Sequence, residues 1–331
     1  MMQIKLFSVR PDEQPAIKAY QEAHPDVELL TTTAELHPDT VTEAQGVDGI
    51  VIQQRSPIGG DASFYQQLHD NGLKQISTRT AGYDVIDVSL ANDADLAVTN
   101  VPAYSPRSVA EFALMQIFRL LRHTVDFDRQ VAHQDFSWNG LVSREIHSVT
   151  VGIIGAGRIG GTLAGLLHSL GAKVLVYDVA PRVEVSYVAE YVSLPELLAQ
   201  SDVISLHVDL NASSTHLLNQ AVFNQMKPGM LLVNASRGPV IDTPALYAAM
   251  DADTVAAVAL DTIEGEGPLF AKDLSDQTIT DPIVKEALAR PNVLLTPHIA
   301  FYTNIAVENM IQIALDDAIA IIKGQDSPHT V

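Results

Sequence analysis

The stretch VGIIGAGRIGG, residues 151–161, decides the fold of this chain, because it carries the glycine spacing G-x-G-x-x-G. An apolar run, TVGIIG (150–155), leads into it, and a run with helical periodicity, GTLAGLLHSLGA (161–172), follows it. A second apolar run, KVLVYD (173–178), then ends in Asp178. A strand, a glycine-rich turn, a helix, a second strand and an acid in this order predict a βαβ unit that binds a dinucleotide.

Each residue of this turn has a physical role in such a unit. Gly155 allows the tight turn, Gly157 lets the backbone approach a pyrophosphate, and Gly160 lets the helix pack closely on the strand. The N-terminus of the following helix directs partial positive charge at the phosphates. Arg158 and Ile159 lie in the same loop, where the guanidinium would add a phosphate contact or remain solvated.

Asp178 predicts which dinucleotide is bound. Its carboxylate would accept hydrogen bonds from the adenosine ribose hydroxyls and would repel a 2′-phosphate, so NAD is favoured over NADP. The alternative to a dinucleotide site is a glycine-rich turn without a ligand, followed by an aspartate on the surface. That alternative does not explain why the strand, the turn, the helix, the second strand and the acid occur in this order.

Short apolar runs alternate with helical patterns along the rest of the chain, which predicts an α/β fold with doubly wound parallel sheets. A length of 331 residues suggests about two domains. The last 30 residues read as helical and are expected to pack back on the N-terminal part. The further predicted strands are IKLFSV (4–9), DGIVI (48–52), LKQIST (73–78), DVISLHV (202–208), MLLVNAS (230–236), VAAVALD (255–261) and VLLTP (293–297).

The composition excludes several classes of function. A formal charge of −20 disfavours a nucleic-acid partner and an anionic membrane surface. The absence of cysteine excludes disulfides, thiolate metal sites and cysteine nucleophiles, and no histidine and carboxylate cluster has metal-ligand spacing. We find no signal-peptide pattern and no apolar run long enough to span a bilayer. A soluble, cytoplasmic protein without a metal is expected.

The segment 101–127 predicts a long and mostly apolar helix. Pro106 suits the first helical turn, and Ser108 with Glu111 three residues later could form a capping box. A helix this apolar should be buried between domains or against another subunit. We favour a subunit interface, and hence a homodimer formed through the helix that follows Ser105.

Charged residues follow three of the predicted strands in the second half, at the edge where open α/β sheets bind their ligands. Arg237 follows MLLVNAS, Asp261 ends VAAVALD with Glu266 close behind, and His298 follows VLLTP. A histidine at the end of a buried strand is most often a core residue satisfied by one hydrogen bond. The other residues at the same edge argue for a catalytic role instead.

Hydride transfer to a ketone places negative charge on oxygen, so the site needs a proton donor and a nearby cation. His298 can donate the proton, and the carboxylate of Glu266 would favour its charged form. Arg237 can make a two-point contact with a substrate carboxylate while it polarises the ketone. Asp261 is expected to hold the carboxamide of the cofactor or to support the site.

These motifs, in this order and spacing, resemble those of the D-isomer-specific 2-hydroxyacid dehydrogenases. The resemblance covers nearly the whole chain and implies a Rossmann NAD domain, residues 101–299, inserted into a flavodoxin-like substrate domain, residues 1–100 and 300–331. The motifs that carry it are VGIIGAGRIGG with YD, NASRG, LDTIEGE, PHIAFYT, STRTAGYD (77–84) and NVPAYSP (100–106).

The resemblance also implies residue roles. The catalytic set would be Arg237, Glu266 and His298. Further cofactor contacts would come from His207, Val208, Asn234, Ala235 and Ser236, and the substrate would be bound by the backbone N–H groups of Ala81 and Gly82 together with Tyr104, Phe301 and Arg237. The family usually places proline after this histidine and valine, whereas this chain has Asp209, so the geometry of that loop is not carried over.

Within the family the chain is most similar to the D-lactate and D-2-hydroxyisocaproate dehydrogenases of fermentative bacteria. Phe301 and the SRG stretch favour the lactate type, so NAD-dependent reduction of pyruvate to D-lactate is expected. The segment 50–54 lacks the tyrosine expected beside the methyl group of pyruvate, and Ile52 would leave room for a larger 2-keto acid. Trp138 would touch the substrate or fill an interface. An alternative of another class is a non-catalytic NAD-sensing corepressor, which can share this fold.

Overall fold

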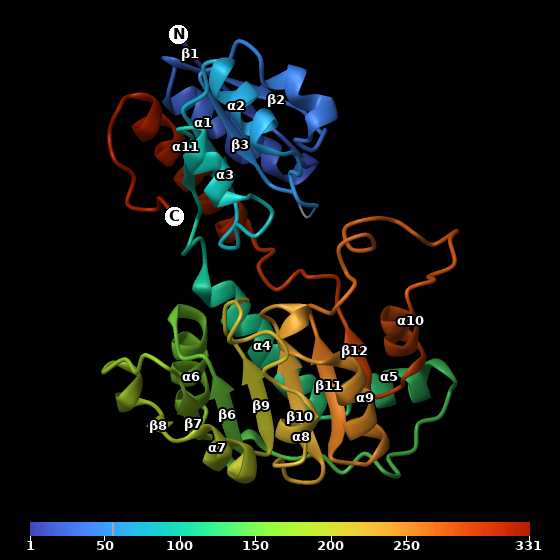
Figure 1. Ribbon diagram of the computed structural model, residues 1–331. Helices are drawn as coiled ribbons and strands as arrows, with labels where there is room; N and C mark the ends of the chain where they lie inside the picture. The colour runs from blue at the N-terminus through green and yellow to red at the C-terminus, as the bar shows by residue number, and fades with distance from the viewer. Residues whose placement is uncertain (55) are drawn as a thin grey trace. The chain divides into compact units, whose positions relative to one another are not determined.

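The chain folds into two compact units. The computed structural model describes residues 1–54 and 56–331. The outer unit comprises Met1–Ser105 and Tyr302–Val331, and the inserted unit comprises Pro106–Phe301 (Figure 1). The chain passes from one unit to the other after Ser105 and after Phe301, a few residues beyond the limits proposed from the sequence.

The outer unit is built on a five-stranded parallel sheet in the order β2-β1-β3-β4-β5. This order is that of flavodoxin-like folds, in which the chain reverses its direction of winding between β1 and β3. Its central strand β3 is buried on both faces, with Ile50 and Ile52 in one core and Val51 in the other. The strands are β1 (Met2–Leu6), β2 (Val27–Thr31), β3 (Gly49–Ile52), β4 (Gln75–Thr78) and β5 (Ala97–Thr99).

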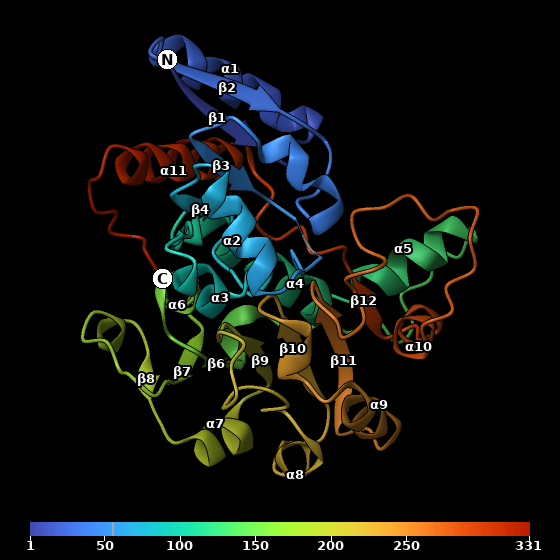
Figure 2. The same ribbon diagram turned by 45° about the horizontal axis from the view of Figure 1, so that its top comes forward.

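Helices cover both faces of this sheet. The C-terminal helix α11 (Asn304–Ile322) lies against β3 and β4, as Figure 2 shows. It also contacts α1 (Gln14–Ala23). The other face carries α2 (Ala62–Asp70) and α3 (Val88–Asp93). The final residues pair with β5, where the N–H of Val331 donates to the carbonyl of Val98. The expected packing of the C-terminal helix on the N-terminal part is confirmed.

The inserted unit is built on a seven-stranded parallel sheet in the order β12-β11-β10-β9-β6-β7-β8. The winding reverses between β6 and β9, as in a Rossmann fold. The fold class expected from the sequence is therefore confirmed. The strands are β6 (Thr150–Ile154), β7 (Lys173–Tyr177), β8 (Glu190–Tyr191), β9 (Val203–Leu206), β10 (Met230–Asn234), β11 (Val255–Leu260) and β12 (Val293–Leu295).

The long apolar helix α4 (Pro106–Leu121) packs within the inserted unit. It lies on α6 (Arg158–Ser169) and on β10 and β11, and its buried residues include Ala110, Ala113 and Ile117. One face of α4 is thus buried within its own unit, and the homodimer expected through this helix stays a prediction. Pro106 begins the helix as expected, but Ser108 lies inside it, so the proposed capping box is wrong.

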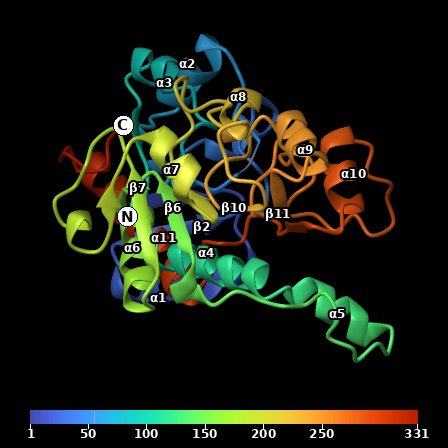
Figure 3. The same ribbon diagram turned by 90° about the horizontal axis from the view of Figure 1, so that it is seen from below.

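The remaining α-helices also belong to the inserted unit. Figure 3 shows α5 extending away from the strands beyond the end of α4. Among the described residues, no helix is long and apolar enough to cross a membrane. The remaining helices are α5 (Thr124–Ala132), α7 (Leu194–Gln200), α8 (Gln220–Phe223), α9 (Thr243–Asp251) and α10 (Pro282–Ala289). Short 3-10 turns lie at 11–13 and 38–44 in the outer unit and at 146–148, 185–187 and 238–240 in the inserted unit.

Candidate active site

Three neighbouring strands of the inserted unit deliver the candidate catalytic residues to one edge. Strands β10, β11 and β12 are adjacent and parallel, so their carboxyl ends lie side by side. Arg237 follows β10, Glu266 lies in the loop after β11, and His298 follows β12. The sheet order therefore gathers loops that are distant in the sequence at a single edge of the sheet.

His298 and Glu266 are in direct contact. The Nδ1 atom of His298 lies 2.6 Å from Oε1 of Glu266, and both side chains are partly buried. The other carboxylate oxygen of Glu266 accepts the backbone N–H of Ile263 at 2.8 Å. A carboxylate at Nδ1 makes that atom the donor and fixes the orientation of the ring, so that Nε2 is left to face a ligand.

Asp261 holds the loop that carries His298. Its Oδ1 accepts the Thr296 hydroxyl at 2.6 Å and the Ile299 N–H at 3.0 Å, and its Oδ2 accepts the Ala300 N–H at 2.9 Å. His298 has φ = +57°, a left-handed conformation that is unfavourable for a side chain and persists only where its surroundings enforce it. The buried Asp261 supplies that restraint on both sides of the histidine. Two roles were expected for Asp261. The structure agrees with the role of holding the site together, and a contact with the carboxamide of the cofactor stays a prediction.

The turn that presents Arg237 is organised by the buried Asn234. The Asn234 amide donates to the Arg237 carbonyl at 3.0 Å and accepts the N–H and the hydroxyl of Ser236 at 3.0 and 2.8 Å. A Cβ atom on Gly238 would lie 2.3 Å from the carbonyl carbon of Ile263, so this turn touches the backbone of the loop that carries Glu266. Only glycine permits that approach, which sets the spacing of the two loops.

A second histidine–carboxylate pair contacts the turn after Arg237 and the loop that carries Glu266. The Nε2 atom of His216 lies 2.8 Å from Oε1 of Glu264, whose other oxygen accepts the Thr243 N–H at 3.1 Å. The hydrogen bond to Glu264 raises the pKa of His216 above its usual value. The backbone N–H of His216 also donates to the Pro239 carbonyl at 2.8 Å. The sequence offered no partner for His216, because its carboxylate is 48 positions away.

The glycine-rich turn has the geometry that a dinucleotide phosphate requires. Gly155 has φ = +91°, and a Cβ there would lie 2.5 Å from the carbonyl oxygen of His207. Helix α6 begins at Arg158, and no side chain caps its first turn at Gly157. Backbone N–H groups at a helix N-terminus that has no side-chain cap can donate to an anion. A hollow of about 340 Å³ lies beside them, lined by Pro106, Gly157, Arg158, Gly161, Thr162, Arg182, Glu184 and Val185.

Asp178 and His207 lie on either side of this turn. Asp178 directly follows β7, and its carboxylate accepts the Ala156 N–H at 2.6 Å and the Ala180 N–H at 2.8 Å. The hydrogen bond from Ala156 holds the glycine-rich turn in place. The Nε2 atom of His207 is 2.8 Å from the Ser205 hydroxyl, while its Nδ1 is buried without a partner among the described residues. Burial lowers the pKa of His207 to about 4, so the ring is neutral at pH 7. An unpaired buried nitrogen beside the glycine-rich turn fits a bound dinucleotide that completes its hydrogen bonding.

The candidate substrate residues of the outer unit form a loop after β4. The carbonyls of Thr80, Ala81 and Gly82 accept hydrogen bonds from the Val101 N–H (2.9 Å), the Asn100 amide (2.7 Å) and the Thr80 hydroxyl (2.5 Å). For the N–H groups of Ala81 and Gly82 the described residues provide no acceptor. With its carbonyls all engaged, the loop presents two donors to an anion.

The other expected site residues occupy the ends of the two units. Tyr104 lies just before the chain leaves the outer unit, and its carbonyl accepts the Asn309 amide at 2.6 Å. Phe301 is the last residue of the inserted unit, and Val208 follows β9 next to His207. In the part of the chain that the structure describes, no three histidine, cysteine, aspartate or glutamate side chains are grouped as metal ligands.

Comparisons with known proteins agree with this geometry. Residues 114–300 match the family described as D-isomer specific 2-hydroxyacid dehydrogenase, NAD binding domain. A D-lactate dehydrogenase of Lactobacillus delbrueckii subsp. bulgaricus is 38% identical over 332 residues, which span 100% of this chain and 99% of the relative. The solved structure of a D-lactate dehydrogenase from a Sporolactobacillus species is 49% identical to this chain, with a TM-score of 0.86. The solved structure of a D-2-hydroxyisocaproate dehydrogenase is 35% identical, with a TM-score of 0.90. Each of these two matches covers 100% of this chain and 99% of the other. The chain therefore belongs to the D-isomer specific 2-hydroxyacid dehydrogenases, and its inserted unit is the NAD-binding domain of that family.

Proposed function

We propose that this protein is an NAD-dependent D-lactate dehydrogenase that catalyses the reversible reduction of pyruvate to D-lactate. The observation that carries the proposal is the 2.6 Å contact between His298 and Glu266 at the sheet edge where Arg237 also emerges. The names of the similar proteins support the choice of lactate, since two of the three described above are D-lactate dehydrogenases.

His298 and Glu266 perform the proton transfer in this proposal. NADH, when bound, supplies the hydride to the carbonyl carbon of the keto acid. His298 donates a proton from Nε2 to the carbonyl oxygen, because Nδ1 faces the carboxylate of Glu266. Glu266 stabilises the imidazolium before the transfer and keeps the ring in one orientation afterwards. In the direction of oxidation, neutral His298 accepts the proton of the hydroxyl group.

Arg237 and the loop after β4 bind the substrate. The guanidinium of Arg237 contacts the carboxylate at two points and stabilises the charge that develops on the adjacent carbonyl oxygen. The N–H groups of Ala81 and Gly82 donate to the same carboxylate. Tyr104 and Phe301 border the side chain of the keto acid.

The inserted unit holds NAD through its glycine-rich turn. The first turn of α6, with Arg158 and Ile159, receives the pyrophosphate. Asp178 accepts from the adenosine ribose and disfavours a 2′-phosphate, although its two hydrogen bonds to backbone N–H groups already occupy part of its capacity. His207, Val208, Asn234 and Ser236 complete the contacts along the carboxyl ends of β9 and β10.

A panel of keto acids tests the proposed function. We expect pyruvate to exceed 2-ketoisocaproate in kcat/KM by roughly tenfold or more, which is the discrimination that a hydrophobic pocket gives per methylene. NADH should be preferred to NADPH in the same assay. A preference for the bulkier acid would show a D-2-hydroxyisocaproate-type enzyme, and absence of turnover with every acid would favour the corepressor alternative.

We also propose that the protein acts as a cytoplasmic homodimer. Helix α5 has no buried residue, and the segment after it exposes Phe136 (76%), Trp138 (84%) and Val142 (90%), an apolar surface that a second copy would cover. The interface expected at α4 would then include the segment that follows this helix. Sedimentation velocity tests the proposed dimer, and a monomer at micromolar concentration would contradict it.

The absence of cysteine suits a reducing compartment such as the cytoplasm. Activity recovered outside the cytoplasmic fraction of the source cells would contradict the proposed location.

A further inference from the structure

We propose that the buried ion pair of Arg79 and Glu13 positions the loop Thr80–Gly82, so that Arg79 determines affinity for the keto-acid carboxylate without touching it. The inference rests on the proposed function, in which the N–H groups of this loop bind that carboxylate. Arg79 is then a positioning residue of the outer unit.

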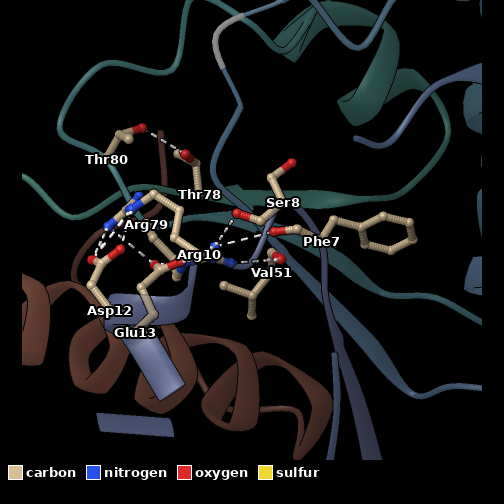
Figure 4. Close-up of polar contacts among 9 residues, drawn as sticks. All are labelled: Phe7, Ser8, Arg10, Asp12, Glu13, Val51, Thr78, Arg79 and Thr80. Carbon is tan, nitrogen blue, oxygen red and sulfur yellow. Dashed lines mark hydrogen bonds and ion pairs between the residues drawn. The ribbon is translucent and has the colours of Figure 1, made fainter. Parts of the chain in front are cut away.

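The pair is completely removed from solvent. Arg79 is 0% exposed and Glu13 is 1% exposed. The Nε atom of Arg79 lies 3.0 Å from Oε1 of Glu13, and Nη2 lies 3.3 Å from Oε2 (Figure 4). Desolvation lowers the pKa of the Arg79 guanidinium, and the carboxylate of Glu13 opposes that shift. The two-point contact fixes the plane of the guanidinium as well as its charge.

The other donors of Arg79 bind backbone carbonyls at the ends of neighbouring strands. Nη1 donates to Val51 at 3.2 Å, and Nη2 donates to Phe7 at 3.1 Å and Ser8 at 3.3 Å (Figure 4). Phe7 and Ser8 directly follow β1, and Val51 lies in β3. The guanidinium therefore ties the ends of β1 and β3 to the residue that follows β4, at the edge where the winding of the sheet reverses.

Stability alone is a weak reason for such a pair. Replacing a buried ion pair by apolar side chains of similar volume is often neutral or stabilising, because removing both charges from water offsets their attraction. The pair does something that apolar side chains cannot do, since Arg79 donates hydrogen bonds to three strand-end carbonyls while it precedes the loop. Ligands of open α/β sheets bind outside the carboxyl ends of strands at the point of reversal, which is where this pair lies.

The loop that follows depends directly on Arg79. Thr80 is the next residue, and its hydroxyl bridges the Thr78 hydroxyl at 2.6 Å and the Gly82 carbonyl at 2.5 Å. Asn100 holds the Ala81 carbonyl from the other side. The loop is thus fixed at its start by the buried pair and along its length by short side chains. A shift of Arg79 would redirect the two N–H donors that the loop presents.

The test is the variant Arg79→Lys in the full chain with NADH bound. Lysine keeps the charge but loses the planar fork, so it cannot bind Glu13 at two points and also hold three carbonyls. We expect KM for pyruvate and the Kd of oxamate, an unreactive analogue, to rise roughly tenfold or more, as a displaced positioning group causes. The Kd of NADH should stay within about twofold and kcat should fall less than KM rises, because the inserted unit is untouched.

Two control variants separate positioning from general destabilisation of the outer unit. Tyr20→Phe removes a hydrogen bond of 2.5 Å to Asp316 between α1 and α11, and Leu68→Ala removes buried volume under α2. Both should lower the melting temperature and leave KM for pyruvate unchanged. If Arg79→Lys does not fold, Glu13→Gln, which keeps the size of the side chain, takes its place with the same expectations.

The outcomes distinguish the inference from the function on which it rests. Absence of keto-acid turnover by the wild-type chain would refute the proposed function. Normal turnover with an unchanged pyruvate KM in Arg79→Lys would overturn the inference alone. An equal rise of KM in Leu68→Ala would also overturn it, because the effect would then follow from loss of stability.

Discussion

The variant His298→Gln should lose roughly 10²–10⁴-fold in kcat for pyruvate reduction, the range that general acid catalysis contributes. Glutamine keeps a side chain that can reach Glu266, but it has no proton to donate near neutral pH. The Kd of NADH should stay within about twofold of the wild type, because the glycine-rich turn lies on other strands of the sheet. Steady-state kinetics and titration of NADH fluorescence measure the two quantities separately.

A matched control for this variant exists on the surface of the inserted unit. His147 also lies beside a glutamate, with Nδ1 3.4 Å from Glu145, but both side chains are exposed. His147→Gln should leave kcat and KM unchanged. Loss of NADH binding in His298→Gln, rather than loss of turnover, would mean that the residue has a structural role and is not the proton donor.

The variant Arg237→Lys should lower kcat/KM for pyruvate by roughly 10²-fold, divided between a higher KM and a lower kcat. The charge is retained, so the change isolates the planar two-point contact with the carboxylate and the stabilisation of the carbonyl oxygen. A charge-assisted hydrogen bond contributes about 1.5–3 kcal/mol, which corresponds to a factor of this size. Initial rates over a matrix of pyruvate and NADH concentrations provide both constants.

Arg290→Lys is the matched control, because Arg290 also makes a two-point contact, with Asp251 at 2.8 and 3.2 Å, but lies at the end of α10. It should change neither constant. Wild-type kinetics in Arg237→Lys would remove Arg237 from the substrate site.

The sequence predicted the strands that carry a continuous apolar run. All nine such runs form strands, most of them ending one to three residues earlier than expected because the last residues of the run belong to the following loop. Strands β2, β5 and β8 were missed. The edge strand β2 (Val27–Thr31) is only partly buried and contains Glu28, while β5 and β8 span three and two residues, so none of them has a strong apolar pattern.

The sequence also predicted which residues follow β10, β11 and β12, but not how they are held. Three features of the site depend on residue pairs that are distant in the chain. They are the left-handed backbone of His298, the hydrogen bond from Thr296 to Asp261 and the hydrogen bond between His216 and Glu264. Such contacts arise from the sheet order, which no local pattern encodes. The buried pair of Glu13 and Arg79 was missed for the same reason.

The most direct test of the central claim is the pH dependence of kcat/KM for pyruvate reduction in the wild type and in His298→Gln. The proposal predicts that the wild type loses activity on the alkaline side, as the imidazolium gives up its proton, and that the residual activity of the variant lacks this decline. A wild-type profile without an alkaline decline, or the same decline in both proteins, would contradict proton donation by His298.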